Sequence, residues 1–147
     1  MNNSRAVVDS SLTVFQLLDT EQSDWAVAAW NHLQAKEAAI YVPRLWVFEV
    51  TSTVHKYLFD GEVTLDEAER ALEAAFELSV NIMDEDLSLC RAAFRWASRL
   101  KQKAAYDGFY LAVAEALNAD FWTADRRLAN AARQLGVTWV HWMGKIK

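Results

Sequence analysis

The sequence predicts one α/β domain in which a mostly parallel central sheet of about five strands is flanked by helices on both faces. Its 147 residues are close to the commonest size of a single domain. Hydrophobic residues make up 53% of the chain, and seven Trp, seven Phe and four Tyr provide a large core. Short apolar runs alternate with helical patterns without hairpin signals between them, which is typical of parallel sheets. No linker or repeat divides the chain, so we expect a single domain over residues 1–147.

The first half of the chain contains two strand patterns and three helical patterns. The apolar run at 6–8 predicts a buried strand, and Asp9 directly after it is a favourable helix N-cap. Pro43 is tolerated in the first turn of a helix, and Asp60 with Gly61 is a typical stop. We expect strands at 6–8 and 39–42 and helices at 12–18, 25–36 and 43–59. The residues expected on the buried face of the second helix are Trp25, Ala28, Ala29 and Leu33.

The second half continues the alternation of helices and strands. Thr64 and Glu67 have the spacing of a capping box at a helix start. The helical segment 107–117 is apolar almost all round, so we expect it to be buried between other elements. The expected helices are 64–78, 86–103, 107–117 and 125–135, and the expected strands are 80–82, 121–123 and 137–142. The residues expected to face the core from the helix at 86–103 are Leu87, Cys90, Phe94 and Ala97.

Composition excludes several classes of protein. The four glycines are too far apart for a phosphate-binding loop, which excludes Walker-type and dinucleotide-binding motifs. A single cysteine, Cys90, excludes an internal disulfide and a Cys-based zinc site. No charge-free run approaches the ~20 residues that span a bilayer, and the first residues lack a signal-peptide pattern. We therefore expect a cytoplasmic protein without a membrane association. The net charge of −5 gives no general attraction for nucleic acid.

Three acidic residues stand at the ends of expected elements, where parallel sheets bind their ligands. Asp9 follows the first strand, Asp107 begins a helix, and Asp125 follows the strand at 121–123. Aspartate is also a favoured helix N-cap, so each residue has a purely structural explanation when it is taken alone. The pattern leaves both roles open for all three residues.

Glu49 lies in the middle of an expected helix among apolar neighbours. Burying its carboxylate without a partner is costly, so the group must be paired or neutralised. Lys56, two turns further along the helix, is one candidate partner. The alternative is a divalent cation shared with the other carboxylates, because four converging acids repel one another strongly unless a cation neutralises them. Oxygen-only ligands of this kind suit Mg²⁺, with Mn²⁺ as a substitute.

Four acidic motifs, in order along almost the whole chain, resemble those of the PIN-domain ribonucleases. Within that family they are most similar to the VapC-type toxins of bacterial and archaeal toxin–antitoxin pairs. The motifs are Val7 to Ser11 around Asp9, Pro43 to Val50 with Glu49, Tyr106 to Glu115 with Asp107, and Thr123 to Leu128 with Asp125. The resemblance therefore implies a PIN-like fold for the whole domain.

The resemblance also implies an activity and a set of partners. It implies a Mg²⁺-dependent endoribonuclease, the toxin of a toxin–antitoxin pair, which hydrolyses RNA phosphodiester bonds with metal-activated water. It further implies a homodimer whose active-site groove is blocked by a cognate antitoxin. Ser52 stands where the family often has Asn, which changes hydrogen bonding at the site without removing a ligand. The residues implied as catalytic metal ligands are Asp9, Glu49, Asp107 and Asp125, with Ser11, Thr123 and Ser52 in supporting positions.

A dense basic segment precedes the third motif. Between residues 91 and 103 the chain has five basic residues and no acidic one: Arg91, Arg95, Arg99, Lys101 and Lys103. The three arginines are spaced by four, so on one helix they form a single stripe. We expect this segment to guide RNA toward the site. A solvated helix face, or a contact with an acidic antitoxin or a second subunit, is the alternative.

Two other functions remain open from the sequence alone. One is a catalytically silent PIN-fold interaction module. The other is a phosphoryl-transfer α/β domain that uses Asp9 as a nucleophile, although the haloacid-dehalogenase pattern needs an Asp where Ser11 stands.

The remaining histidines and tryptophans show no catalytic spacing. His32, His55 and His141 are expected to be ordinary core or surface residues. The seven Trp are expected to build the core and a subunit interface, with a base-stacking surface as the alternative. Trp139 and Trp142 are the strongest candidates for that alternative, because terminal strands are often exposed.

Overall fold

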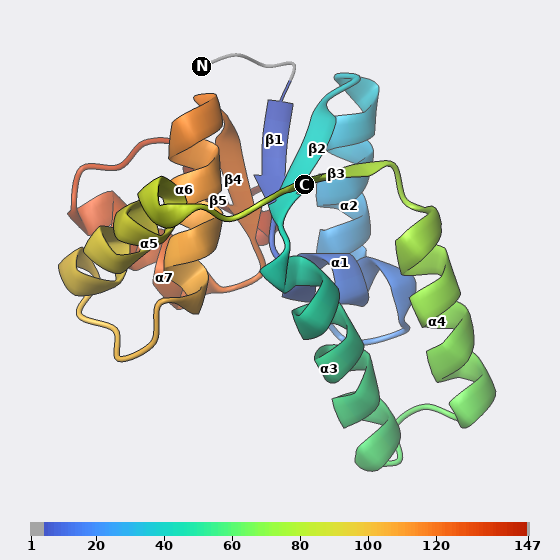
Figure 1. The fold of residues 1–147 in the computed structure, drawn as a ribbon. Helices are drawn as coiled ribbons and strands as arrows, with labels where there is room; N and C mark the ends of the chain where they lie inside the picture. Colours follow the sequence, from blue (N-terminus) through green and yellow to red (C-terminus); the bar gives the residue numbers. More distant parts are fainter. Residues whose placement is uncertain (1–4, 147) are drawn as a thin grey trace.

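The computed structural model describes residues 5–146, which form a single sheet with helices on both faces (Figure 1). All strand pairs are parallel, and the strand order is β3-β2-β1-β4-β5. The strands are β1 (Arg5–Val8), β2 (Ala39–Pro43), β3 (Val80–Met83), β4 (Asp120–Thr123) and β5 (Val140–Trp142). The prediction of a parallel α/β fold is confirmed. Residues 1–4 and 147 lie outside the described residues. The expected domain over residues 1–147 includes them, and residues 1–4 are also part of the N-terminal segment that lacks a signal-peptide pattern.

The helices connect the strands by crossovers on the two faces of the sheet. Connections toward β3 pass over one face and those toward β5 over the other, because right-handed crossovers in opposite directions lie on opposite faces. Figure 1 shows α5 and α6 in front of the sheet and α2 behind it. The helices are α1 (Ser10–Leu17), α2 (Ser23–Ala35), α3 (Leu45–Phe59), α4 (Leu65–Glu77), α5 (Leu87–Arg99), α6 (Tyr106–Leu117), α7 (Arg126–Gln134) and the 3-10 helix η1 (Met143–Lys145). None of those described is long and apolar enough to cross a membrane.

The core centres on β1 and on α6, which packs across β1, β2 and β4. Val7 and Val8 of β1 are fully buried, as are Leu111 and Val113 of α6. The nearly all-round apolar surface of α6 therefore serves the packing that its sequence predicts. Each side chain of this size contributes about 1.5–3 kcal/mol when it is buried. β1, which leads into Asp9, and α6, which carries Asp107, thus belong to the buried core of the fold.

The buried face of α5 differs from the predicted one. Leu87 is 64% exposed and Phe94 is 75% exposed, so the prediction that they face the core is wrong, and Cys90 is only partly buried. A Cβ on Gly108 of α6 would overlap the backbone carbonyl of Ala93, so the two helices meet along small residues. This close approach sets the rotation of α5. The residues that α5 buries are Leu89, Ala93, Trp96 and Ala97.

The buried face of α2 is also rotated from the prediction. Trp25 is 45% exposed and Ala28 is only partly buried, whereas Ala26 and Trp30 are buried. The reason is that α2 packs against both α1 and η1, and η1 comes from the far end of the chain. A helical pattern alone does not reveal a second neighbour of this kind.

Several element boundaries differ from the sequence pattern, mostly by one or two residues. α5 ends at Arg99, earlier than predicted, because Lys101 adopts a left-handed conformation with φ 56° that stops the helix. Pro43 is the last residue of β2, and α3 begins only at Leu45. β5 is limited to Val140–Trp142.

The close contact between α5 and α6 gives a test of the fold. Gly108→Ala should lower the free energy of unfolding by about 1–3 kcal/mol, because the added methyl group overlaps the Ala93 carbonyl. Helix propensity alone predicts the opposite sign, since Ala is favoured over Gly by about 1 kcal/mol within a helix. Urea unfolding measures the difference, and Ala116→Ser, at an exposed position of α6, is the control. Unchanged or higher stability of Gly108→Ala would contradict this packing.

Candidate functional site

The four predicted carboxylates lie at the carboxyl edge of the sheet. Asp9 directly follows β1 and Asp125 lies two residues beyond β4, and these two strands are neighbours. Glu49 lies in the second turn of α3, which follows β2, and Asp107 lies in the first turn of α6. Parallel strands bind their ligands at this edge. The fold therefore brings to one edge four residues that are far apart in the sequence.

Asp9 is buried and firmly held by hydrogen bonds. Its Oδ1 accepts from the backbone N–H of Leu12 at 2.8 Å, which makes it the N-cap of α1. Its Oδ2 accepts from the hydroxyl of Thr123 and from the backbone N–H of Ala124 at 3.3 Å. Burial raises the pKa of Asp9 to about 6 against these bonds, with a smaller contribution from the charge of Asp107. Capping and a site role are thus compatible for this residue, and Thr123 holds the orientation of its carboxylate.

Glu49 is held by two hydroxyl groups rather than by a lysine. The hydroxyl of Tyr110 donates to its Oε1 at 2.7 Å, and the hydroxyl of Ser10 donates to the same oxygen at 3.5 Å. Lys56 forms no ion pair with it among residues 5–146, so the pairing alternative is wrong. Burial, and then the charge of Asp107, raise the pKa of Glu49. Burial also raises the pKa of Tyr110, which keeps its hydroxyl protonated as a donor.

Asp107 is oriented from the loop that precedes α6. The side-chain amide of Gln102 donates to its Oδ2 at 3.0 Å. Ala105 is the N-cap of α6, so the capping explanation does not apply to Asp107. Burial raises the pKa of Asp107, and the charge of Asp125 raises it further. Asp125 does cap its helix, because its Oδ1 accepts from the backbone N–H groups at the start of α7.

The four carboxylates interact electrostatically without a counter-charge. The charge of Asp107 acts on both Asp9 and Glu49, and the charge of Asp125 acts on Asp107. None of the ion pairs between residues 5 and 146 involves any of the four. A set of oxygen ligands with uncompensated negative charge suits a hard divalent cation such as Mg²⁺ or Mn²⁺.

The coordination geometry itself is not preformed. Within the described range, no group of three His, Cys, Asp or Glu side chains already surrounds one point at ligand distance. All four carboxylates are instead held by hydrogen bonds to their own surroundings. Three accept from the side chains of Thr123, Tyr110 and Gln102, and the fourth accepts from the first N–H groups of α7. The chemistry of the donor set thus fits a cation, while the present side-chain positions satisfy the protein's own hydrogen bonds.

The supporting residues differ in part from the predicted ones. Ser11 lines a groove beside Lys56 and makes no hydrogen bond to Asp9 in the described chain, and its neighbour Ser10 contacts the site instead. Ser52 is exposed and bonds to none of the four carboxylates within residues 5–146. The sequence reasoning also missed Tyr110 and Gln102. The position of Tyr110, three residues after Asp107 on one helix, is a usable signal, whereas Gln102 lies in a loop and has none.

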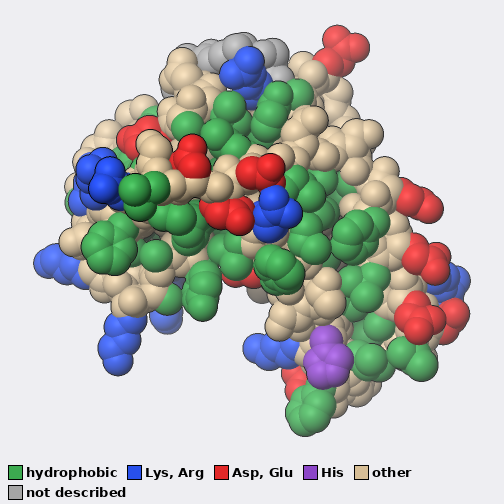
Figure 2. All heavy atoms as spheres, viewed as in Figure 1, with side chains coloured by type: hydrophobic (Ala, Val, Ile, Leu, Met, Phe, Trp, Pro, Cys, Tyr) green, Lys and Arg blue, Asp and Glu red, His purple; other side chains and the backbone are tan. Residues whose placement is uncertain are grey.

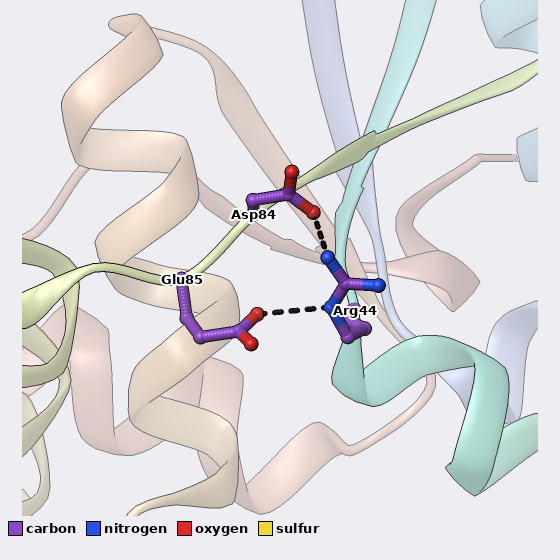
Figure 3. A network of polar contacts seen from close by, with 3 residues as sticks. All are labelled: Arg44, Asp84 and Glu85. Atoms are coloured by element: carbon purple, nitrogen blue, oxygen red, sulfur yellow. Dashed lines mark hydrogen bonds and ion pairs between the residues drawn. The ribbon is translucent and has the colours of Figure 1, made fainter.

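The start of α3 is fixed to the connection between β3 and α5. Arg44, which precedes α3, forms ion pairs with Asp84 and with Glu85, the latter at 3.2 Å (Figure 3). These side chains are about half exposed or more, so the pairs contribute little to overall stability. Their value is positional, because they join the helix that carries Glu49 to a segment about 40 residues away.

The predicted basic segment falls into two parts. Arg91, Arg95 and Arg99 are exposed on α5, and the guanidinium of Arg99 lies 4.3 Å from the centre of the Trp96 ring. Lys101 and Lys103 lie in the loop after α5, on either side of Gln102. Since Gln102 contacts Asp107, this loop borders the site, and the two lysines of the loop are exposed to solvent.

The surface beside the site combines paired charges with apolar side chains. Figure 2 shows acidic side chains with a basic side chain beside them near the middle of one face, and hydrophobic side chains around them. A hollow of about 190 Å³ lies between α3 and α6 and is lined mainly by apolar residues, including Pro43, Leu45 and Phe109. Around it, Phe48 is 64% exposed and Tyr106 is 59% exposed. Apolar surface of this kind on a single chain is typical of an interaction site.

An all-parallel five-stranded α/β fold with coupled carboxylates at its carboxyl edge defines the class of this protein. The sequence profile of the PIN domain family matches residues 6–134, and the chain belongs to that family. A comparison with curated protein sequences gave no match.

Solved structures confirm the fold. The FitAB complex bound to an IR36 DNA fragment is 18% identical, with a TM-score of 0.66 over 97% of each chain. VapC20 of Mycobacterium tuberculosis, described as a Sarcin-Ricin loop cleaving toxin, is 14% identical, with a TM-score of 0.64 over 86% of this chain and 94% of its own. PAE2754 of Pyrobaculum aerophilum is 21% identical, with a TM-score of 0.63 over 88% and 80%. At these identities the likeness shows the shared fold.

The raised pKa of Asp9 predicts how stability depends on pH without a cation. The group is protonated in the folded state up to about pH 6 but only to about pH 4 when unfolded, so its ionisation destabilises the fold as pH rises. From Asp9 this loss is at most about 3 kcal/mol between about pH 4 and pH 7. Urea unfolding in EDTA across this range should show a smaller loss for Asp9→Asn than for the wild type. Asp60→Asn, at the far end of α3, should follow the wild type. If the free energy of unfolding of Asp9→Asn and of wild type falls in parallel as pH rises, ionisation of Asp9 does not destabilise the fold.

Proposed function

We propose that this chain is an endoribonuclease that depends on Mg²⁺ or Mn²⁺ and acts as the toxin of a toxin–antitoxin pair. One observation carries the proposal: Asp9, Glu49, Asp107 and Asp125 interact at the carboxyl edge of the sheet without a counter-charge from any described ion pair. Burial and mutual repulsion raise the pKa values of three of these carboxyl groups, Asp9, Glu49 and Asp107. A protein gains from this strain when a cation relieves it during function.

The chain's own residues would position the reaction. Asp9, Glu49, Asp107 and Asp125 would hold the cation, which when bound neutralises the phosphate and makes water a better nucleophile. Thr123 fixes the orientation of Asp9, Tyr110 fixes that of Glu49, and Gln102 fixes that of Asp107. Carboxylate side chains that are oriented in advance lose less conformational freedom when the substrate binds. In this proposal Thr123, Tyr110 and Gln102 are positioning residues.

RNA as the substrate is supported by the charge around the site. Lys101 and Lys103 flank the residue that holds Asp107, and the three exposed arginines of α5 extend the positive surface away from it. Lys and Arg supply the attraction for a phosphate backbone that a net charge of −5 does not. VapC20, which shares the fold, is described as a Sarcin-Ricin loop cleaving toxin, and this supports RNA as the substrate.

Protein partners are supported by the exposed apolar surface. The hollow between α3 and α6 is lined mainly by apolar side chains, and two of them, Phe48 and Tyr106, are more than half exposed. We propose that a homodimer and a cognate antitoxin together cover this surface in the cytoplasm. The toxin–antitoxin complex from Klebsiella pneumoniae, with a TM-score of 0.63, shows that the same fold occurs in such assemblies.

The cleavage test uses two site variants. Wild-type protein should degrade a mixed RNA pool in Mg²⁺ or Mn²⁺, and EDTA should stop the reaction. Asp9→Asn and Asp107→Asn should each lower the rate at least a hundredfold, because each removes a ligand charge from the site. Asp60→Asn is the matched control and should keep the wild-type rate. If the purified wild type cuts no RNA with either cation, the chain is a silent interaction module and the proposal is wrong.

A second test detects the cation without catalysis. Millimolar Mn²⁺ or Mg²⁺ should raise the melting temperature of the wild type, because a ligand that binds only the folded state stabilises it by mass action. The increase should be smaller in Glu49→Gln, which has one negative charge fewer, and unchanged in the surface variant Glu73→Gln. Differential scanning fluorimetry over a wide titration gives the comparison. If the cation raises the melting temperature of Glu49→Gln and of wild type by the same amount, Glu49 is not a ligand of the cation.

A further inference from the structure

An aromatic cluster lies at the end of β5 and has no part in the proposed chemistry. We define the Trp25 cluster as Trp25, Trp142 and Arg126. The rings of Trp25 and Trp142 meet edge to face, with their centres 5.3 Å apart. The guanidinium carbon of Arg126 lies 4.6 Å from the centre of the Trp142 ring. Three segments that are distant in the sequence, α2, β5 and α7, thus contribute one side chain each.

The Trp25 cluster lies at the same edge of the sheet as the four carboxylates. Trp142 is paired in register with Thr123, whose hydroxyl contacts Asp9, and adjacent strands are only about 4.8 Å apart. Arg126 directly follows Asp125. Trp25 lies in the first turn of α2, and α2 ends just before β2 begins at the opposite edge, so its first turn is at the carboxyl edge. The cluster therefore borders the site on the β5 side.

The cluster is both ordered and open to solvent. A single exposed tryptophan needs no explanation by itself. Here, however, Trp142 is fixed by Arg126 on its ring and by Gly144, where a Cβ would overlap that ring. Trp25 leans on this fixed ring and still leaves 45% of its surface exposed, whereas four other Trp are at least 93% buried. The four are Trp30, Trp46, Trp96 and Trp122.

The chemistry of the Trp25 cluster matches an unstacked nucleobase beside a phosphate. An exposed indole that is held in place stacks on any flat aromatic ring, and such stacking is how proteins hold bases of single-stranded RNA. Arg126 and the exposed Arg127 add positive charge next to Asp125, where the acidic site would otherwise repel a phosphate. A hydrophobic side chain of a protein partner would use the indole but would have no need of the two arginines.

We propose that Trp25 stacks on one base of single-stranded RNA next to the scissile phosphate, with Trp142 and Arg126 holding it in place. This inference rests on the proposed ribonuclease function and deepens it, because it assigns a nucleotide subsite on the β5 side of the carboxylates. It makes the base at one position of the substrate a determinant of binding. Stacking is tolerant of base identity, so any preference there is for the presence of a base.

Binding to abasic RNA tests the stacking directly. Short single-stranded RNAs with one abasic site at successive positions are titrated against protein in the Asp107→Asn background, so that none is cut, with fluorescence anisotropy as the readout. Trp25→Leu should weaken binding of intact RNA about tenfold. In the parent protein, which keeps Trp25, removing the base at one position of the RNA should weaken RNA binding by a similar factor. In Trp25→Leu, removing the same base should cause no further loss of affinity. Phe59→Leu, at an aromatic position that is 81% exposed at the far end of α3, is the matched control and should bind like the parent.

The outcomes separate this inference from the proposed function. The subsite is wrong if Trp25→Leu and its parent bind RNA with equal affinity. It is also wrong if, at every abasic position, the loss of affinity from the missing base adds to the loss from Trp25→Leu. In both cases, cleavage of RNA by the wild type would still support the nuclease function. If Trp25→Leu leaves RNA binding unchanged but weakens binding of a co-expressed protein partner, the cluster is a protein contact and the subsite is wrong. If the wild type neither binds nor cuts RNA, both proposals fail. Melting curves show whether Trp25→Leu remains folded.

Discussion

Mutual repulsion among four carboxylates at one edge of the sheet is the constraint on which the rest of the structure depends. Asp9, Glu49, Asp107 and Asp125 would separate if their backbones were free to move, and the fold opposes this by attaching two of them, Asp9 and Asp107, to deeply buried elements. β1, which leads into Asp9, is fully buried at Val7 and Val8, and α6, which carries Asp107, is covered by α5 and the sheet. The folding free energy of the core thus offsets the electrostatic strain of the site.

Each strained carboxylate is held by a neutral donor rather than by a cation of the protein. Thr123, Tyr110 and Gln102 give hydrogen bonds that fix orientation while leaving the negative charge in place. A lysine or arginine at these positions would stabilise the fold but would also compete with a bound metal ion. Positive charge is found instead outside this ring of donors, on Lys101, Lys103 and Arg126. This arrangement suits a site that keeps its negative charge for a cation and attracts a phosphate backbone only at its border.

Several features of the molecule follow from alternating patterns that the sequence displays openly. The order of helices and strands, the parallel sheet and the buried character of α6 are all local or periodic properties, and they were predicted. The sequence singled out Glu49 by its apolar helical neighbours, whereas Asp9, Asp107 and Asp125 were singled out by their places at element ends together with the resemblance to the PIN-domain motifs. The Thr64–Glu67 capping box is present as expected, since both partners lie within one turn.

What the sequence determined by itself was therefore the set of elements and the identity of the acidic residues, because these depend on neighbours within a few positions. Only the tertiary structure decided which groups support them. Tyr110 reaches Glu49 across 61 residues, and Thr123 reaches Asp9 across 114. The choice of Ser10 over Ser11, and the rotation of α5 set by Ala93 against Gly108, likewise depend on how separate elements pack. Such contacts are fixed by close packing in three dimensions, and a one-dimensional pattern holds no record of the distances that packing sets.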